Sequence, residues 1–214
     1  MLHRPLVYAD APPRDFVPVH DEIIGTRPCL PRVGLQKSEI IRVGGGEGMG
    51  PLSKTARAID KSGLPVSLVI VTGRNAKLKA ALKERAWQNP AFIYGFTQNM
   101  CDFMRAADVI VTKAGPGTIA EALNAELPII LYAKLPGQED GIVEFVESEG
   151  VGVWAPETQD VVETLRLWIN QPGKREMVIK NGQRVARPHA ARQIARILGA
   201  QVGLTGQSQE ATTI

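Results

Sequence analysis

From Glu39 onward, the sequence alternates short apolar runs with amphipathic stretches, and each apolar run ends at a glycine or another turn-forming residue. This alternation is typical of strands that are each followed by a helix. The runs Pro65–Val71 and Asp108–Val111 are rich in β-branched residues and apolar on both faces, as strands of a parallel sheet covered by helices should be. The sequence therefore predicts a doubly wound, Rossmann-like α/β fold.

The same pattern predicts the individual elements. Strands are expected at about 39–43, 66–72, 91–94, 108–112, 128–132 and 151–154, and helices at about 52–62, 76–86, 98–106, 117–125, 138–148, 158–170 and 174–198. The last helix has apolar residues on one face and arginines on the other, so it is predicted to pack against the sheet as a final cover. Pro188 lies inside it and predicts a kink or break just before that residue.

Three regions are predicted along the chain. Residues 1–38 contain six prolines and no sustained periodicity, which indicates an extended or poorly ordered leader. Residues 39–198 form one nucleotide-binding domain on this interpretation. Residues 199–214 are rich in Gly, Gln, Ser and Thr and are predicted to be disordered.

Composition restricts the function further. The chain is 44% hydrophobic and 22% charged, as in ordinary globular domains, and it has no apolar run of the roughly 18 residues that a membrane-spanning helix needs. The first thirty residues contain no readable targeting signal. Two distant cysteines, Cys29 and Cys101, and three scattered histidines show no metal-ligand spacing, so no metal site is predicted.

Charge gives a weaker indication. A net charge of +3 is too small to indicate a nucleic-acid partner. Residues 166–196, however, hold eight Lys or Arg against the single acid Glu176. We interpret this stretch as a solvated helix face, with an anionic lipid surface as the alternative.

Two glycine-rich loops are expected at the same edge of the sheet. The first, Gly44–Pro51, follows the first predicted strand and precedes a helix, and Gly115-Pro-Gly117 does the same after the strand ending at Val111. Glycines allow close backbone approach to a phosphate, whose charge the N–H groups of a helix start complement. Each loop alone fits a tight turn as well as a phosphate-binding loop. Ligands of open α/β sheets bind along this edge, however, so two such loops there favour a phosphate ligand.

Two common phosphate-binding families are disfavoured. The first loop does not fit G-x-G-x-x-G, and Val71–Asn75 offers no acid for an adenosine ribose, which argues against NAD. Lys54 is not placed as in a Walker motif, which argues against a nucleoside triphosphatase.

Two acidic segments each allow two interpretations. Thr118 and Glu121 have the spacing of a helix capping box, which by itself is the simpler explanation of Glu121. Gln138 and Glu139 stand where a helix is expected to begin and could hold sugar hydroxyls. The alternative is a solvated helix start, where acids are favoured in any case.

Together, three motifs resemble one family. Gly44–Pro51, Lys113–Ala122 and Gly137-Gln-Glu139, in this order and spacing, closely resemble the monogalactosyldiacylglycerol synthases, which are related to the bacterial enzyme that adds N-acetylglucosamine to lipid I. The resemblance runs from about Ile41 to Leu198. It implies the donor-binding, carboxyl-terminal half of an inverting GT-B glycosyltransferase.

The resemblance also implies roles for particular residues. The donor diphosphate would contact Gly45, Gly46, Glu47, Gly48, Met49 and Gly50. The uracil and ribose would contact Phe96, Thr97, Gly115, Gly117, Thr118 and Glu121. Galactose would contact Gln138 and Glu139. In this family the amino-terminal half holds the lipid acceptor and the general base, and neither is recognisable here.

The sequence departs from the family at two points. Glu39–Val43 is more polar than the family's first strand, and Ile142 stands where the family usually has Asn, which leaves the sugar preference open.

Backbone donors and helix dipoles can stabilise departing UDP, so no cofactor or metal is strictly required.

These residues leave three functions to distinguish. The first is transfer of galactose from UDP-galactose to diacylglycerol, at a chloroplast envelope surface by resemblance. The second is a UDP-sugar-binding module that needs an acceptor-binding partner. The third is a protein for another nucleotide such as NAD, which the missing ribose acid disfavours.

Overall fold

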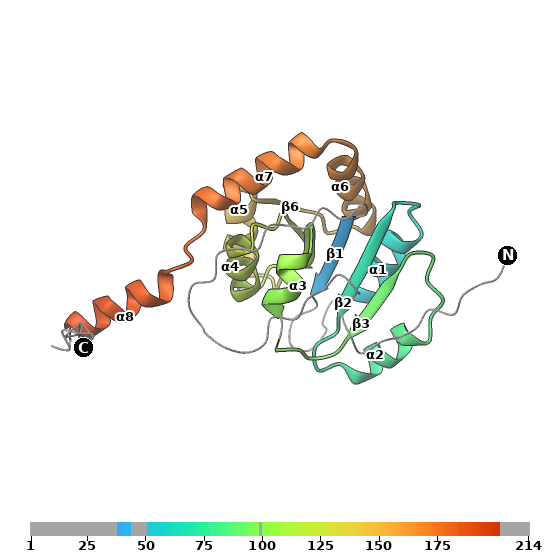
Figure 1. The fold of residues 1–214 in the computed structure, drawn as a ribbon, viewed down its shortest axis with the longest axis horizontal. Coiled ribbons are helices and arrows are strands. Elements are labelled where there is room, and N and C mark those ends of the chain that lie inside the picture. Colours follow the sequence, from blue (N-terminus) through green and yellow to red (C-terminus); the bar gives the residue numbers. More distant parts are fainter. Residues whose placement is uncertain (1–37, 44–50, 99, 202–214) are drawn as a thin grey trace, which may run out of the picture.

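The computed structural model describes residues 38–43, 51–98 and 100–201. In these residues six parallel strands form one sheet with the order β3-β2-β1-β4-β5-β6 (Figure 1). The chain adds strands outward from β1 on one side and then, from β4, on the other, which is the strand order of the Rossmann fold. The predicted doubly wound α/β class is confirmed.

The elements follow the predicted alternation. The strands are β1 (Ser38–Val43), β2 (Val66–Val71), β3 (Ala91–Tyr94), β4 (Val109–Lys113), β5 (Ile129–Ala133) and β6 (Gly152–Trp154). The helices are α1 (Leu52–Asp60), α2 (Ala76–Lys83), α3 (Met100–Ala106), α4 (Pro116–Asn124), α5 (Asp140–Ser148), α6 (Thr158–Asn170), α7 (Pro172–Val185) and α8 (Ala190–Gln201). The polar stretch Glu39–Val43 does form the central strand, because β1 pairs with both β2 and β4.

Alternating strand residues supply two cores, one on each face of the sheet. One core joins buried residues of α1, α2 and α6 to strand residues such as Leu68 and Val111. The other joins α3, α4 and α5 to residues such as Val69 and Ile110. Burial on both faces explains why the strand sequences are apolar throughout rather than alternating.

The last predicted helix is two helices. α7 ends at Val185 and α8 begins at Ala190, so the break expected at Pro188 is confirmed. The expectation that this whole segment covers the sheet is wrong for α8, which has no buried residue and extends away from the body (Figure 1). Its apolar side chains Ile194, Ile197 and Leu198 are 57%, 60% and 56% exposed. The physical reason is Pro188, which prevents one continuous helix and lets the chain change direction.

The predicted ends of the chain are tested only in part. The disordered tail expected from Gly199 is wrong for its first residues, because α8 continues through Gln201. Residues 1–37 and 202–214, with the predictions made for them, lie outside the described residues. Within the described part, no helix is long and apolar enough to span a membrane.

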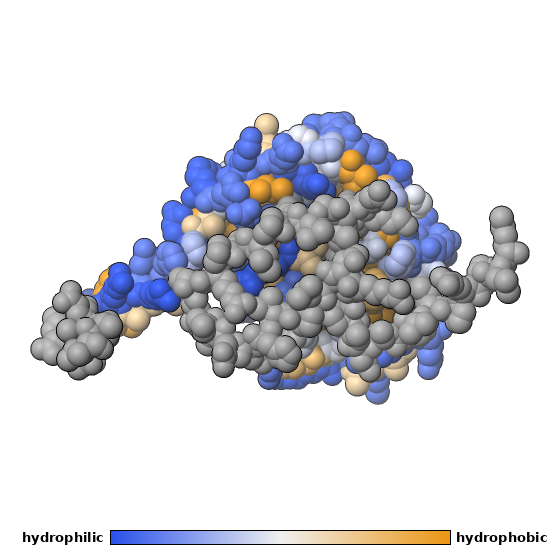
Figure 2. All heavy atoms as spheres, viewed as in Figure 1, coloured by the Kyte–Doolittle hydropathy of each residue, from blue (hydrophilic) through white to orange (hydrophobic). Residues whose placement is uncertain are grey.

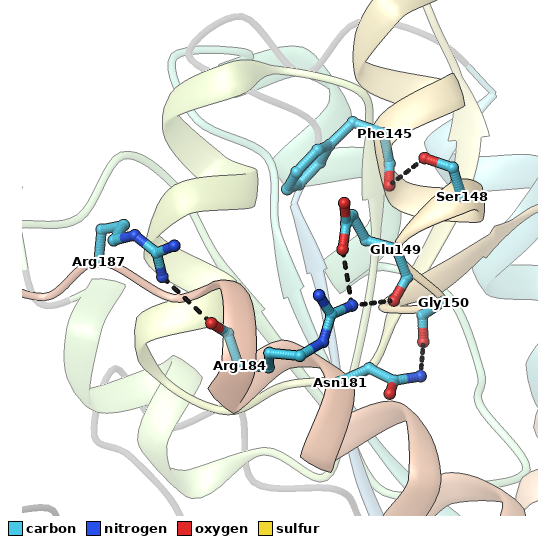
Figure 3. A network of polar contacts seen from close by, with 7 residues as sticks. All are labelled: Phe145, Ser148, Glu149, Gly150, Asn181, Arg184 and Arg187. Carbon is cyan, nitrogen blue, oxygen red and sulfur yellow. Dashed lines mark hydrogen bonds and ion pairs between the residues drawn. The ribbon is translucent and has the colours of Figure 1, made fainter.

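α7 contacts α6 and α4, and its polar side chains bind the turns that precede β4 and β6. Asn181 donates a hydrogen bond of 3.0 Å to the Gly150 carbonyl oxygen (Figure 3). Arg184 lies 2.6 Å from a carboxylate oxygen of Glu149. Hydrophilic residues dominate the surface visible over α7 (Figure 2). Part of the basic stretch 166–196 thus binds acids and carbonyls of the chain itself, at the amino edge of the sheet.

Candidate functional site

Glycine-rich turns open at the carboxyl edge of the sheet, after β4 and β5. Gly115 is the N-cap of α4, and Pro116 occupies the first helical turn, where its missing N–H costs nothing. A Cβ added to Gly117 would meet no atom of the described residues within 4 Å, so packing among them does not require glycine there. Gly137, by contrast, has a φ of +79°, which glycine adopts without strain. The first loop, Gly45–Gly50, lies outside the described residues.

The capping box considered for Thr118 and Glu121 is not formed. Helix α4 begins at Pro116 with Gly115 as its N-cap, so Thr118 is already its third residue and not the cap. The sequence interpretation placed the helix start too late because a proline followed by glycine resembles a turn. Glu121 is exposed on α4. The helix start therefore does not explain Glu121.

Phe96 lies in the loop after β3 and is 61% exposed, which is unusual for a large aromatic side chain. The Arg74 guanidinium, from the loop after β2, lies 5.2 Å from the centre of its ring, within cation–π range. Thr72 fixes the two strand ends by donating from its hydroxyl to the Tyr94 carbonyl oxygen at 3.1 Å. Phe96 thus lies next to the Arg74 cation, and Thr97, which follows it in the chain, is half-buried.

The predicted sugar-binding residues differ sharply in exposure. Gln138 is exposed in the turn before α5, whereas Glu139 is 3% exposed and is the N-cap of that helix. One carboxylate oxygen of Glu139 lies 2.6 Å from the Lys113 ammonium, and the other accepts the Leu135 N–H at 2.8 Å. Glu139 is therefore not the solvated helix start considered above. The helix begins two residues later than predicted.

The pairing of Lys113 with Glu139 was not predicted from the sequence. The available signal was a lone lysine at the end of an apolar strand, where a charge needs a partner. Ile142, noted above as a departure from the family, is partly buried in α5 and packs against the core that α3, α4 and α5 share, so an apolar residue fits there. Among the described residues, no group of three or more His, Cys, Asp or Glu side chains could hold a metal ion.

Asp140, the first residue of α5, closes the same turn. Its carboxylate pairs with Lys134 at 2.8 Å and accepts the Gly137 N–H at 2.9 Å. The hydrogen bond from Lys134, with the smaller contribution of the Gly137 N–H, holds the pKa of this carboxyl below its ordinary value. Because the pKa of Asp140 is lower in the folded state, its ionised carboxylate stabilises the fold at pH values above the ordinary aspartate pKa. This contribution is lost as the pH falls through the lowered pKa of the folded state.

We expect a carbon-13 NMR titration to give Asp140 a pKa below that of an ordinary aspartate. Lys134→Met should raise this pKa towards the ordinary value, because the largest cause of the shift is then removed. Lys61→Met, at the far end of α1, changes the net charge equally and should leave it in place. An Asp140 pKa at or above the ordinary value in the unchanged protein would contradict the geometry of the turn.

Comparison with known proteins shows what this chain is similar to. Residues 41–140 match the glycosyltransferase family 28 C-terminal domain. The chain is 36% identical over 191 residues to monogalactosyldiacylglycerol synthase 3, chloroplastic, of Arabidopsis thaliana, covering 79% of this chain and 41% of that protein. The chain thus spans less than half of the length of this relative.

Solved structures support the fold. The glycotransferase of kitacinnamycin superposes with a TM-score of 0.63 at 17% identity, over 87% of this chain and 48% of that one. A UDP co-structure of MnaA from S. aureus superposes with a TM-score of 0.61 at 14% identity, over 83% and 49% of the two chains. In both, the matched part is about half of the larger chain. This chain is therefore similar to the glycosyltransferase family 28 C-terminal domain over residues 41–140, and to the monogalactosyldiacylglycerol synthases over part of their length.

Proposed function

We propose that this chain is the donor-binding domain of an inverting glycosyltransferase that transfers galactose from UDP-galactose to 1,2-diacylglycerol. One observation carries the proposal. The loops after β3, β4 and β5, which bear Phe96, Gly115 and Gln138, open at one edge of the sheet, inside the segment that matches the family 28 domain. That edge is where open α/β sheets bind nucleotides.

The donor would lie along this edge. Phe96 and Thr97 would take the uracil, Glu121 with Gly115, Gly117 and Thr118 the ribose side, and Gln138 with Glu139 the galactose. Gly45–Gly50 would take the diphosphate. N–H groups at the start of α4 would help to stabilise the departing UDP, so this mechanism calls for no metal or other cofactor.

The acceptor hydroxyl would attack the anomeric carbon from the face opposite the diphosphate, which inverts its configuration, while a general base takes the hydroxyl proton. That base would be supplied by the acceptor-binding domain of the enzyme. Because the relatives are chloroplastic by name, we place the reaction at a chloroplast envelope surface, with the protein peripheral to it.

A second function is supported by what the matched segment contains. The segment 41–140 matches a C-terminal domain by description, and the residues in it that support the proposal all concern the donor. On this alternative the chain binds UDP-sugars but turns over only with a partner that supplies an acceptor-binding domain. Turnover of UDP-galactose with diacylglycerol vesicles, with and without such a partner, separates the two functions.

Calorimetric titration with UDP tests the proposal common to both. The unchanged chain should bind UDP saturably, and Glu121→Ala should weaken binding by about tenfold or more, as expected for loss of a charged hydrogen-bond acceptor. The matched control is Glu176→Ala, which removes an exposed acid of α7 from the amino-edge side and should leave affinity unchanged. Absence of UDP binding by the unchanged chain would rule out a working donor domain.

A further inference from the structure

An ion pair joins the carboxyl ends of two adjacent strands in the proposed site. Lys113 is the last residue of β4, and its ammonium lies 2.6 Å from Glu139, which follows β5. Glu139 also accepts the Leu135 N–H at 2.8 Å. Both carboxylate oxygens are therefore already bound within the chain before any sugar arrives.

Stability alone does not explain this pair. Taking two charges out of water offsets much of their attraction, so a buried ion pair is weak evidence for a stabilising role. The two side chains are also unequal, because Lys113 keeps 22% of its side chain exposed and Glu139 only 4%. An ammonium has three N–H donors, of which Glu139 needs one. The arrangement thus fixes the direction of a cation that remains accessible.

The cation points to where a negative ligand group would lie. A Cβ added to Gly115 would come 3.5 Å from the Lys113 ammonium nitrogen, so this charge sits beside the N-cap of α4. β4 is also the strand at which the sheet order reverses, and ligands bind in the crevice beside such strands. In a nucleotide sugar the charged part is the diphosphate, and lysine binds phosphate as a point charge.

We propose that Lys113 is a further donor-binding residue, which contacts the diphosphate, and that Glu139 is the positioning residue that holds it there. This assignment rests on the proposed function. On this assignment Glu139 affects the affinity for the nucleotide part of the donor. If Glu139 contacted only galactose, it would have no effect on that affinity.

Titration with UDP, which carries no sugar, distinguishes the two roles. Lys113→Met should weaken UDP binding by about tenfold to a hundredfold, the usual value of a charged hydrogen bond. Glu139→Gln should also weaken it, because the side-chain NH2 group of glutamine replaces one of the two carboxylate oxygens and cannot accept a hydrogen bond from Lys113 or from the Leu135 N–H. A simple charge effect predicts the reverse, since removing an acid favours an anion. Lys113→Arg keeps the cation and should recover part of the affinity.

The double variant Lys113→Met/Glu139→Gln should bind UDP about as weakly as the single variant with the lower UDP affinity, since the two residues act together. It also leaves no buried charge unpaired, so it remains measurable if Lys113→Met proves unstable. Lys61→Met is the charge control and should bind normally. Unchanged UDP affinity in Lys113→Met, or unchanged or tighter binding in Glu139→Gln, overturns this assignment alone. Failure of the unchanged chain to bind UDP overturns the proposed function with it.

Discussion

Gly152→Ala is expected to lower the free energy of unfolding by more than about 3 kcal/mol, the range of severe overpacking. Gly152 pairs with Ile129 in the β5–β6 ladder. A Cβ there would overlap the Ile129 carbonyl oxygen and lie 2.8 Å from the Ile129 Cβ. Neither group can move away without separating the two strands, because both belong to a fully buried part of β5.

Urea unfolding of the two proteins measures this difference. Gly173→Ala is the matched control, because a Cβ added at this position in α7 meets nothing within 4 Å. Alanine is the better helix former, so the control should be neutral or slightly stabilising. An unfolding midpoint of Gly152→Ala equal to that of the unchanged protein would show that β6 does not pair closely with β5.

Asp60→Ala is the second change with a large expected effect, a loss of about 3 kcal/mol in the free energy of unfolding. Asp60 is 4% exposed at the end of α1. Its Oδ1 accepts the backbone N–H groups of Gln88 and Asn89, both at 2.9 Å. Alanine would leave two N–H donors of the turn before β3 without this acceptor, and replacing an acceptor in a buried site costs more than the bond itself contributes.

Asp60→Asn keeps a hydrogen-bond acceptor at this position but removes its negative charge, so it separates the two contributions. Asparagine keeps a side-chain oxygen of similar position, so the loss should shrink to about 1 kcal/mol, the value of a neutral hydrogen bond. Hydrogen bonding of Gln88 and Asn89 can be followed by their amide proton shifts in the same samples. Equal unfolding free energies for Asp60→Ala and the unchanged protein would mean that Asp60 does not fix this turn.

The fold was predictable because its signals are local and repeated. Each strand is a short, β-branched run between turn residues, and burial on both faces follows from helices lying on each side of the sheet. The position of Phe96, Gly115 and Gln138 was predictable for the same reason. Once strands are parallel, their carboxyl ends meet at one edge, and residues just after them must gather there.

What the sequence did not predict depends on contacts distant along the chain. Nothing near Asp60 indicates that it binds a turn 28 residues later, and an acid at a helix end is normally read as solvated. Lys113 and Glu139 are also distant along the chain, 26 residues apart, and the start of α4 at Pro116 was missed because a proline followed by glycine resembles a turn. Amphipathic patterning correctly gave α8 its helix, but the pattern does not say which surface covers the apolar face.

The uncovered face of α8 has a consequence for cooperativity. Helices of about 12–15 residues are marginal in water on their own, and α8 has 12 residues with none buried. Its backbone amides should therefore exchange with solvent by local opening, at a free energy unrelated to that of the sheet. In the isolated chain, α8 and the sheet domain should therefore unfold independently, each with its own free energy. A partner surface that covers Ile194, Ile197 and Leu198 would raise the free energy of opening α8 without changing that of the sheet domain.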